Sequence, residues 1–334
     1  MTMSRNINAR VSCLLAPGKL VFEEEIIDPA SLAPGDVAVA TEFSAISPGT
    51  ELAAYSGAPP LRPGNPYPRL VGYCNCGRVI SAGGDVEKIR AGDRVLTFAS
   101  HRSHYRMPAK EIAALVPPAL HGALASVTYL FHLGYAALLR AGAKAGDRVG
   151  VIGLGALGIA AVAMAREIGA HVIALSGREA ALAKVRRLGA GETLKLDDPA
   201  VAEIGADIVV STSNKWDDWL AALRAARRGG IIAVLGFPGR EQPQPLFNPL
   251  DSQYFYDKHL TFMAAGHLIE SDQSPEAGAL VLHRNMAYLV DLISKDRLPA
   301  QEMACHILPA EELAKAYDDL LARRGDALTY VLRW

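Results

Sequence analysis

Short apolar runs separated by turn-forming residues fill about the first 115 residues of the chain. The runs at residues 36–40, 76–80 and 94–98 alternate with clusters rich in Gly, Pro and Asp, at 33–36, 82–85 and 91–93. Such clusters break regular structure, so each one marks a turn between two short strands. This part of the chain is therefore expected to be β-rich.

From residue 120 onward, stretches of helical length alternate with short apolar runs. Helices are expected at residues 120–139, 160–168, 180–188 and 217–226. Strands are expected at 148–152, 171–175, 207–211, 231–236 and 260–265. Alternation of strand and helix predicts a doubly wound parallel sheet with right-handed crossovers.

The pattern changes again after residue 266 and no longer extends this alternation. A helix at 274–294, a strand at 305–308, a helix at 311–323 and a closing strand at 327–332 are expected. We assign them to the β-rich part, which makes that domain discontinuous, with residues 1–117 and 267–334. Residues 118–266 form the α/β domain between them. A chain of 334 residues that is 50% hydrophobic can bury two cores of ordinary size.

A glycine motif follows the strand expected at 148–152. Gly153, Gly155 and Gly158 have the spacing G-x-G-x-x-G and lead into a helix. The first glycine permits a tight turn, the second lets the backbone approach a pyrophosphate, and the third lets helix pack closely on strand. The helix N-terminus, with Ala156 and Leu157, offers N–H groups to phosphates. A dinucleotide site is predicted; the alternative is a turn that is merely rich in glycine.

The end of the second strand of this domain indicates which dinucleotide binds. It carries Ser176-Gly177-Arg178, where an NAD site would place an acidic residue on the ribose 2′-hydroxyl. A hydroxyl and a guanidinium would instead hold a 2′-phosphate, so NADP(H) is predicted. In the alternative, Arg178 is solvated or stacks on adenine. The ends of the next two strands add four expected cofactor contacts: Ser211, Ser213, Leu235 and Gly236.

Composition and charge exclude several other classes of protein. With 34 basic and 35 acidic residues in no long run, the chain lacks the electrostatic pattern of a protein that binds nucleic acid or an acidic membrane. The first residues contain no apolar segment of a secretion signal, and the longest apolar run, 149–165, is interrupted by the glycine motif. The four cysteines suit reduced thiols, so a cytoplasmic protein is expected. Its expected partner is a small-molecule substrate.

The chain resembles the medium-chain dehydrogenase/reductase superfamily in the order of its domains throughout, and several stretches resemble it closely. These are residues 43–52 (Phe-Ser-Ala-Ile-Ser-Pro-Gly-Thr-Glu-Leu), 68–73, 77–83 and 91–95. The resemblance implies a GroES-like barrel domain interrupted by a Rossmann domain. It also implies a homodimer formed through the last Rossmann strand, since an unpaired apolar edge tends to find a partner. Residues 46–51 are similar to the branch that contains bacteriochlorophyllide hydroxyethyl dehydrogenase.

Zinc members of this superfamily hold a catalytic zinc with three protein ligands, and the chain departs from them at all three positions. The first position falls on Ser47 or Pro48, the second on Tyr73 and the third near Tyr129. None is a good zinc ligand, because zinc sites use thiolate, imidazole or carboxylate groups. Cys74 is the alternative ligand beside Tyr73, although Cys74-Asn-Cys76 reads more simply as buried strand residues. We predict an enzyme without zinc.

Without a metal, side chains must donate to the oxygen on which charge develops. Ser47, Tyr73 and Tyr129 place three hydroxyls around the vacated metal position, and Tyr73 is the first choice of donor. Its alternative role is to fill the space that the lost ligand leaves. Thr50 resembles the relay hydroxyl of the zinc enzymes, and Glu51 is expected to cap or to hydrogen-bond rather than to act as a base.

Three histidines and one tyrosine are further candidates. His101 and His104 lie in a loop that often faces substrate in relatives, and His132 shares a helix face with Tyr129. Tyr254 lines either a substrate pocket or a subunit contact. Each of the histidines has a core or surface position as its alternative.

The function expected is a zinc-independent, NADPH-linked oxidoreductase that acts on a C=O/CHOH pair, or on C=N, of a small metabolite. One alternative is an enoyl or quinone reductase that reduces C=C. An enone would distinguish the two, because the first reaction yields an allylic alcohol and the second a saturated ketone. Another alternative is a protein that binds NADPH without catalysis.

Overall fold

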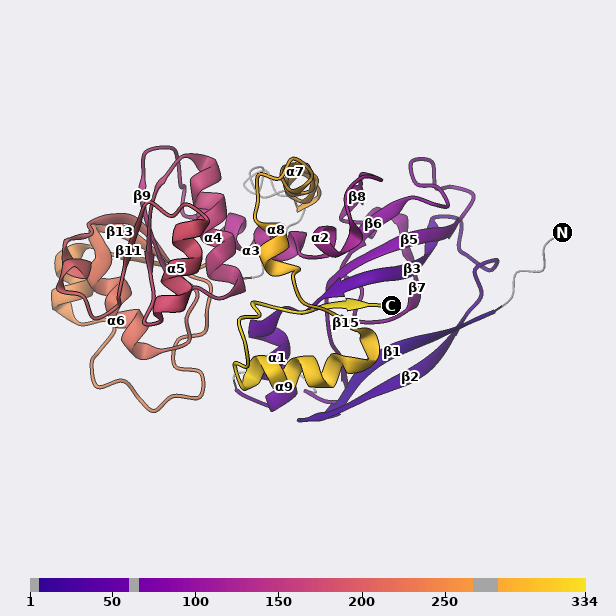
Figure 1. Ribbon diagram of the computed structural model, residues 1–334, viewed down its shortest axis with the longest axis horizontal. Helices are drawn as coiled ribbons and strands as arrows, with labels where there is room; N and C mark the ends of the chain where they lie inside the picture. The colour runs from indigo at the N-terminus through magenta and orange to yellow at the C-terminus, as the bar shows by residue number, and fades with distance from the viewer. Residues whose placement is uncertain (1–5, 60–65, 267–281) are drawn as a thin grey trace. The chain divides into compact units, whose positions relative to one another are not determined.

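The computed structural model describes residues 6–59, 66–266 and 282–334 (Figure 1). The chain forms two compact units: a barrel unit, Met1–Tyr129 with Leu282–Trp334, and a Rossmann unit, Leu130–Val281. The first boundary lies within α3 (Thr128–Arg140), rather than near residue 118, because α2 (Gly122–Ser126) packs on the barrel strands β3 (Asp36–Ala45) and β5 (Cys74–Ala82). Residues 274–281, the first part of the helix expected at 274–294, lie outside the described residues.

The Rossmann unit is built on a six-stranded parallel sheet. Its strands are β9 (Arg148–Ile152), β10 (His171–Leu175), β11 (Glu192–Leu194), β12 (Ala206–Ser211), β13 (Ala226–Val234) and β14 (Thr261–Ala264). They lie in the order β11-β10-β9-β12-β13-β14. Counted from β9, this is the order 3-2-1-4-5-6 of dinucleotide-binding folds, in which ligands bind at the carboxyl ends of the strands. The predicted doubly wound sheet is confirmed.

Helices and short turns connect these strands. They are α4 (Ala156–Ile168), α5 (Glu179–Arg187), the 3₁₀ turn Pro199–Glu203, α6 (Trp216–Ala225) and the π-helical turn Ser252–Tyr256. Trp219 and Leu223 of α6 are buried in one apolar cluster with Ile152 and Ile232 of the sheet. This apolar layer fixes β9, which leads into the glycine motif.

Strand ends and helix ends agree with the sequence pattern to different degrees. β9 and β10 begin and end at the residues expected, whereas the expected helix at 120–139 is divided into α2 and α3 at Val127. Gly122–Arg140 is long and apolar enough to cross a membrane, but 83% of that window is buried inside the protein, as in the core helix of a globular protein. β11 was not expected, because its three residues are too few for a pattern.

The barrel unit contains two sheets. The larger has the order β15-β16-β3-β5-β6-β8, with β7 paired to β3, and the smaller is β2-β1-β4. The strands not yet located are β1 (Ile7–Ala16), β2 (Lys19–Ile27), β4 (Arg69–Leu70), β6 (Arg94–Thr97), β7 (His104–Pro108), β8 (Ala114–Val116), β15 (Ile307–Pro309) and β16 (Val331–Arg333). Because β16 pairs with β3, the last strand of the chain joins a sheet formed by its first part.

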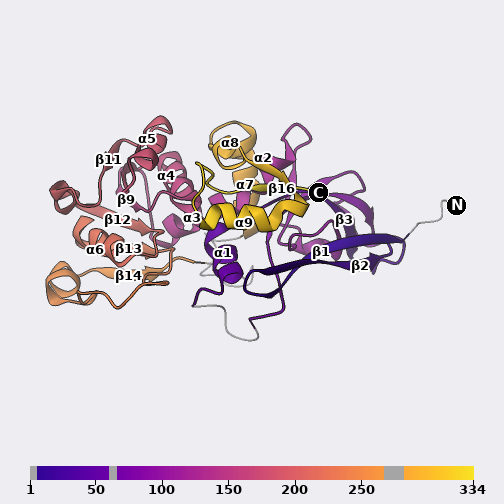
Figure 2. The same ribbon diagram turned by 60° about the horizontal axis from the view of Figure 1, so that its bottom comes forward.

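The helices of the barrel unit are α1 (Pro48–Ser56), α7 (Leu282–Ser294), α8 (Ala300–Met303) and α9 (Leu313–Leu321), with 3₁₀ turns at Ala109–Glu111 and Ala310–Glu312. α9 lies beside α1 in both views (Figure 2) and contacts it. Tyr317 of α9 is completely buried in a core that also contains Leu14, Ile46 and Leu332. This core joins the first and last parts of the chain beneath the start of α1.

Candidate functional site

The glycine turn after β9 has the geometry that its spacing predicts. Gly153 has φ of +84°, a conformation that favours glycine. A Cβ atom on Gly158 would lie 1.8 Å from the Gly153 carbonyl oxygen, so helix and turn approach too closely for any side chain there. A Cβ atom on Gly155 would meet nothing within 4 Å, which leaves open space beside its backbone. The turn is closed on one side and open on the other.

Thr212 supports this turn, although the sequence pattern drew attention only to its neighbours Ser211 and Ser213. Its hydroxyl donates to the Gly153 carbonyl at 2.8 Å. The hydroxyl oxygen of Thr212 would lie 2.8 Å from a Cβ atom on Gly153. The only signal in the sequence is its position at the carboxyl end of β12, which pairs with β9 through Ser211 and Ile152.

The first turn of α4 has N–H groups that are available to a ligand. Gly155 is the N-cap residue, and it provides no side-chain cap. The N–H groups of Ala156 and Leu157 therefore lie at the positive end of the helix dipole without a capping oxygen from that residue. This combination suits a phosphate group.

The end of β10 carries the three residues predicted to distinguish NADP from NAD. Ser176 is buried, and its hydroxyl accepts the backbone N–H of Arg178 at 3.2 Å. Gly177 and Arg178 are exposed, and Arg178 is the N-cap residue of α5. Ser176 therefore shapes the turn, while the guanidinium of Arg178 is accessible to solvent.

Ser211, Leu235 and Gly236 connect two neighbouring strand ends at the same edge of the sheet. The Ser211 carbonyl accepts N–H groups from Leu235 at 2.8 Å and from Gly236 at 3.0 Å. A Cβ atom on Gly236 would lie 2.5 Å from the Ser213 carbonyl oxygen, so glycine permits this close approach. Ser213 itself is partly exposed, and its hydroxyl accepts the N–H of Lys215.

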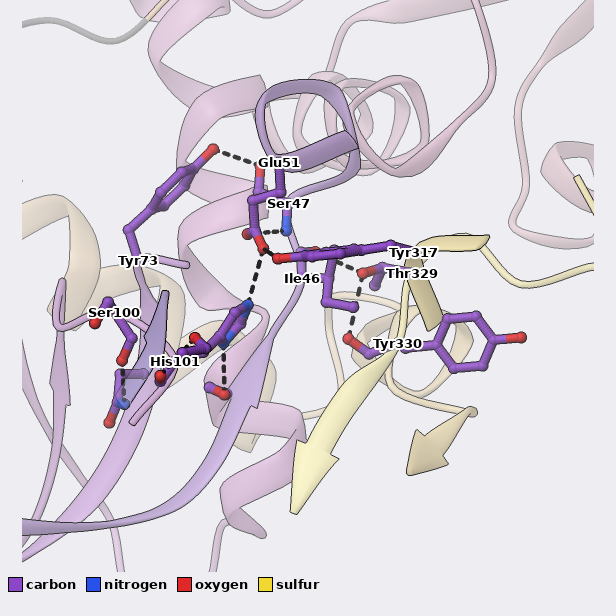
Figure 3. Close-up of polar contacts among 12 residues, drawn as sticks. Ile46, Ser47, Glu51, Tyr73, Ser100, His101, Tyr317, Thr329 and Tyr330 are labelled. Carbon is purple, nitrogen blue, oxygen red and sulfur yellow. Dashed lines mark hydrogen bonds and ion pairs between the residues drawn. The ribbon is translucent and has the colours of Figure 1, made fainter. Parts of the chain in front are cut away.

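A pair of hydroxyl groups lies in the barrel unit at the start of α1. The Tyr73 phenol donates to Ser47 Oγ at 2.6 Å (Figure 3). Ser47 is the N-cap residue of α1, and Pro48 at the first helical position suits the start of a helix. Thr50, in the first turn of α1, lies close enough to the Tyr73 phenol to lower its pKa. Three of the residues predicted to act without a metal therefore come together.

The surroundings of Tyr73 keep its phenol protonated. Burial raises its pKa above the ordinary value of 10.0, and the nearby Cys74 and Glu51 raise it further, against the smaller, lowering effect of Ser47 and Thr50. The ring meets that of Tyr129 edge to face at 5.7 Å, and Tyr129 meets Phe98 at 4.8 Å. Tyr129, 5% exposed, thus belongs to the aromatic wall beside the hydroxyl pair.

These groups do not form a zinc site. Within residues 6–59, 66–266 and 282–334, no three His, Cys, Asp or Glu side chains are grouped so that they could hold a metal ion. Burial raises the pKa of the Cys74 thiol well above its ordinary value, so its side chain is a neutral thiol. The donor set at the expected position is a serine hydroxyl and a phenol that bond to each other.

The remaining four candidates are distributed over the two units. His101 is completely buried and pairs with Glu51, so its ring does not face a substrate. His104, in β7, is half-buried beside Ser103, and burial lowers its pKa. His132 is buried in the Rossmann unit, where Tyr254 packs against the core described above.

Glu51 is the feature of this site that sequence reasoning described only in part. Its carboxylate is 2% exposed, and Oε1 accepts the backbone N–H of Ser47 at 2.7 Å. This bond resembles a capping box, in which an acidic side chain reaches back to the N-cap residue. The expected capping role is present, and bonds to His101 and Tyr317 add to it.

Comparisons with known proteins agree with this architecture. A family described as zinc-binding dehydrogenases matches residues 156–279. A probable zinc-binding alcohol dehydrogenase of Mycobacterium tuberculosis is 25% identical over 92% of this chain and 84% of its own. The 2-desacetyl-2-hydroxyethyl bacteriochlorophyllide A dehydrogenase of Cereibacter sphaeroides is 44% identical over 69 residues, which is 21% of each chain.

A solved structure has the same fold over the whole chain. It is a protein of Sinorhizobium meliloti assigned to the zinc-binding dehydrogenases and bound to NADP, with a TM-score of 0.78 and 18% identity. The alignment covers 98% of this chain and 100% of that one. Taken with the strand order, these likenesses support the resemblance of the chain to the medium-chain dehydrogenase/reductase superfamily.

Proposed function

We propose that this protein is an NADPH-dependent oxidoreductase that interconverts a C=O (or C=N) group and the corresponding alcohol (or amine) of a small molecule without a metal ion. The observation that carries the proposal is the bond from Tyr73 to Ser47, 2.6 Å long. Two hydroxyls stand where zinc-dependent relatives place metal ligands. They can supply a proton where a zinc ion would supply positive charge.

The Rossmann unit has the residues to hold the cofactor. The open space beside Gly155 and the N–H groups at the start of α4 suit its pyrophosphate. The exposed Arg178 suits the 2′-phosphate as a charge-assisted partner. When bound, the nicotinamide supplies a hydride to the carbonyl carbon.

The Ser47–Tyr73 pair then donates a proton to the carbonyl oxygen of the substrate. Ser47 Oγ accepts from Tyr73, so the hydrogen of Ser47 is available to donate. As negative charge develops on the substrate oxygen, Ser47 gives it this proton and takes the proton of Tyr73 in turn. An alkoxide is a stronger base than a phenolate, so this transfer is favourable even though the pKa of Tyr73 is raised. Thr50, which lies beside the phenol, can return a proton from solvent.

The preference for NADPH is expected to depend on Arg178. In Arg178→Gln, the KM for NADPH should rise by about 10- to 100-fold, the loss expected for one charged hydrogen-bonding partner of a phosphate. The KM for NADH, which lacks that phosphate, should change by less than about twofold. Steady-state kinetics with both cofactors measure the two effects.

Arg187→Gln is the matched control for this experiment. Arg187 is also exposed and also lies on α5, at its opposite end, about 13 Å along the helix from Arg178. It should bind both cofactors as the wild type does. A wild type that prefers NADH, or an Arg178→Gln variant with unchanged NADPH kinetics, would reject the assignment of the cofactor.

Removal of metal ions should leave the activity unchanged. The groups at the expected zinc position are hydroxyls, and the nearest thiol, Cys74, has a raised pKa, so we expect no stoichiometric zinc. After exhaustive dialysis against a strong chelator, kcat should stay within about 20% of its starting value, and elemental analysis should find less than about 0.1 zinc per chain. Loss of activity that added zinc restores would overturn the metal-free mechanism.

A further inference from the structure

The buried carboxylate of Glu51 lies next to the Ser47–Tyr73 pair, and both of its oxygens have hydrogen-bonding partners. Glu51 Oε1 accepts the N–H of Ser47 at 2.7 Å, and Oε2 accepts the Tyr317 phenol at 2.6 Å. His101 Nε2 lies 2.8 Å from the same Oε2 atom (Figure 3). Burial of a carboxylate is costly unless its oxygens are hydrogen-bonded, and all three bonds here come from donors that are themselves buried.

The partners of His101 are compatible with a ring that donates to Glu51. Ser44 Oγ lies 2.8 Å from Nδ1 and also accepts the indole N–H of Trp334 at 2.8 Å. Because the indole can only donate, the Ser44 hydroxyl is free to donate its own hydrogen to Nδ1. The ring then donates from Nε2 to Glu51. In this arrangement both ring nitrogens and both carboxylate oxygens have a hydrogen-bonding partner.

The same ring also contacts the segment that carries Tyr73. Gly72 has φ of +89°, and a Cβ atom there would lie 2.6 Å from Cγ and Cδ2 of His101. The backbone N–H of His101 donates to the Val71 carbonyl at 2.8 Å. His101 therefore touches the backbone just before Tyr73 and, through Glu51, holds the backbone of Ser47. One side chain connects both halves of the hydroxyl pair.

We propose that Glu51 and His101 are positioning residues that set the Ser47–Tyr73 geometry for proton donation. This proposal rests on the proposed function, since it assigns the hydroxyl pair to the substrate oxygen. Neither residue exchanges a proton with the substrate, because both are enclosed by protein. Their contribution is to hold Ser47 Oγ within reach of the phenol, and a displacement of about 1 Å at such a site can reduce turnover by about 100-fold.

The test compares His101→Leu with His101→Gln. His101→Leu removes the donor to Glu51, whereas the amide of His101→Gln can restore an N–H at that position. We expect kcat per NADPH-binding site to fall by about 100-fold in His101→Leu and to recover at least about tenfold in His101→Gln. The dissociation constant of NADPH, measured by fluorescence, should stay within about twofold, because the change is confined to the barrel unit.

Ser12→Ala is the control for a purely structural effect. The buried Ser12 hydroxyl donates to the backbone carbonyl of His101 at 2.7 Å and does not touch the ring. This variant should lose stability and keep its kcat. If His101→Leu likewise melts at a lower temperature but keeps its kcat per NADPH site, the pair is structural and the proposal fails.

A second variant and a reference variant complete the experiment. Should His101→Leu fail to fold, Glu51→Gln takes its place. This variant keeps the shape of the side chain and the bond to Ser47 but removes the charge, and its kcat should fall by about tenfold. A wild-type kcat in Glu51→Gln would overturn the proposal. Tyr73→Phe separates the two levels of the argument. If Tyr73→Phe is slow and the His101 and Glu51 variants are not, only the positioning role fails; if Tyr73→Phe is as fast as the wild type, the proposed function itself fails.

Discussion

Gly158→Ala is expected to destabilise the Rossmann unit and to weaken NADPH binding by at least about 100-fold. The new Cβ atom would lie 1.8 Å from the Gly153 carbonyl oxygen, which belongs to the backbone and cannot rotate away. Alanine favours a helix over glycine by about 1 kcal/mol, but overpacking costs about 1–3 kcal/mol and here also displaces the turn. The clash therefore outweighs the gain. Thermal unfolding and a fluorescence titration with NADPH measure the two losses.

Gly155→Ala separates binding from stability at the same turn. Its Cβ atom would meet nothing within 4 Å, so the free energy of unfolding should change by less than about 0.5 kcal/mol. The space that it would fill is the space that we assign to the pyrophosphate, and NADPH should bind about 10- to 100-fold more weakly. Wild-type affinity in Gly155→Ala would place the cofactor elsewhere.

Tyr73→Phe is expected to lower kcat by about 100-fold or more with little change in NADPH affinity. The substitution keeps the ring that packs on Tyr129 and removes the hydrogen bond to Ser47. Loss of a general acid or of a donor to a developing oxyanion costs about 10²- to 10³-fold. Stopped-flow measurement of NADPH oxidation gives the rate of the chemical step directly.

The pH dependence provides a second measurement on Tyr73. Burial raises its pKa, so the phenol stays protonated above pH 10, its ordinary pKa, and its ionisation should not reduce activity below that pH. Tyr105→Phe is the control, because that buried phenol bonds to Thr97 and Asn75 rather than to the pair. It should keep the kcat of the wild type. A Tyr73→Phe variant with full turnover would exclude the phenol as donor.

Local features of the Rossmann unit could be predicted from the sequence, because short-range physics determines them. Gly153, Gly155 and Gly158 lie close together in the chain, and each requirement for glycine follows from the turn itself. β9 and β10 are short apolar runs with clear ends, and the structure places them at the expected residues. Thr212 could not be identified, because it meets the turn only when β12 pairs beside β9, and Thr212 and Gly153 are 59 positions apart in the chain.

The candidate site in the barrel unit was harder to predict for the same reason. Ser47, Thr50 and Tyr73 could be brought together through the resemblance to zinc enzymes, and in the structure Tyr73 bonds to Ser47 and Thr50 lies near the phenol. His101 was expected near substrate because it lies in a loop with His104. It is instead buried against Glu51, a partner 50 positions away, and nothing local in the sequence signals that pairing.

The hydrogen bond from Tyr317 to Glu51 has a consequence for folding during synthesis on the ribosome. The two residues are separated by 266 positions, and the whole Rossmann unit is translated between them. A nascent chain can complete its parallel sheet while Glu51 still lacks the phenol that completes its hydrogen bonding. The hydrogen bonding around Glu51 is therefore completed late in synthesis, when α9 docks on α1, and a Rossmann unit that folds early would be finished before the proposed Ser47–Tyr73 geometry is fixed.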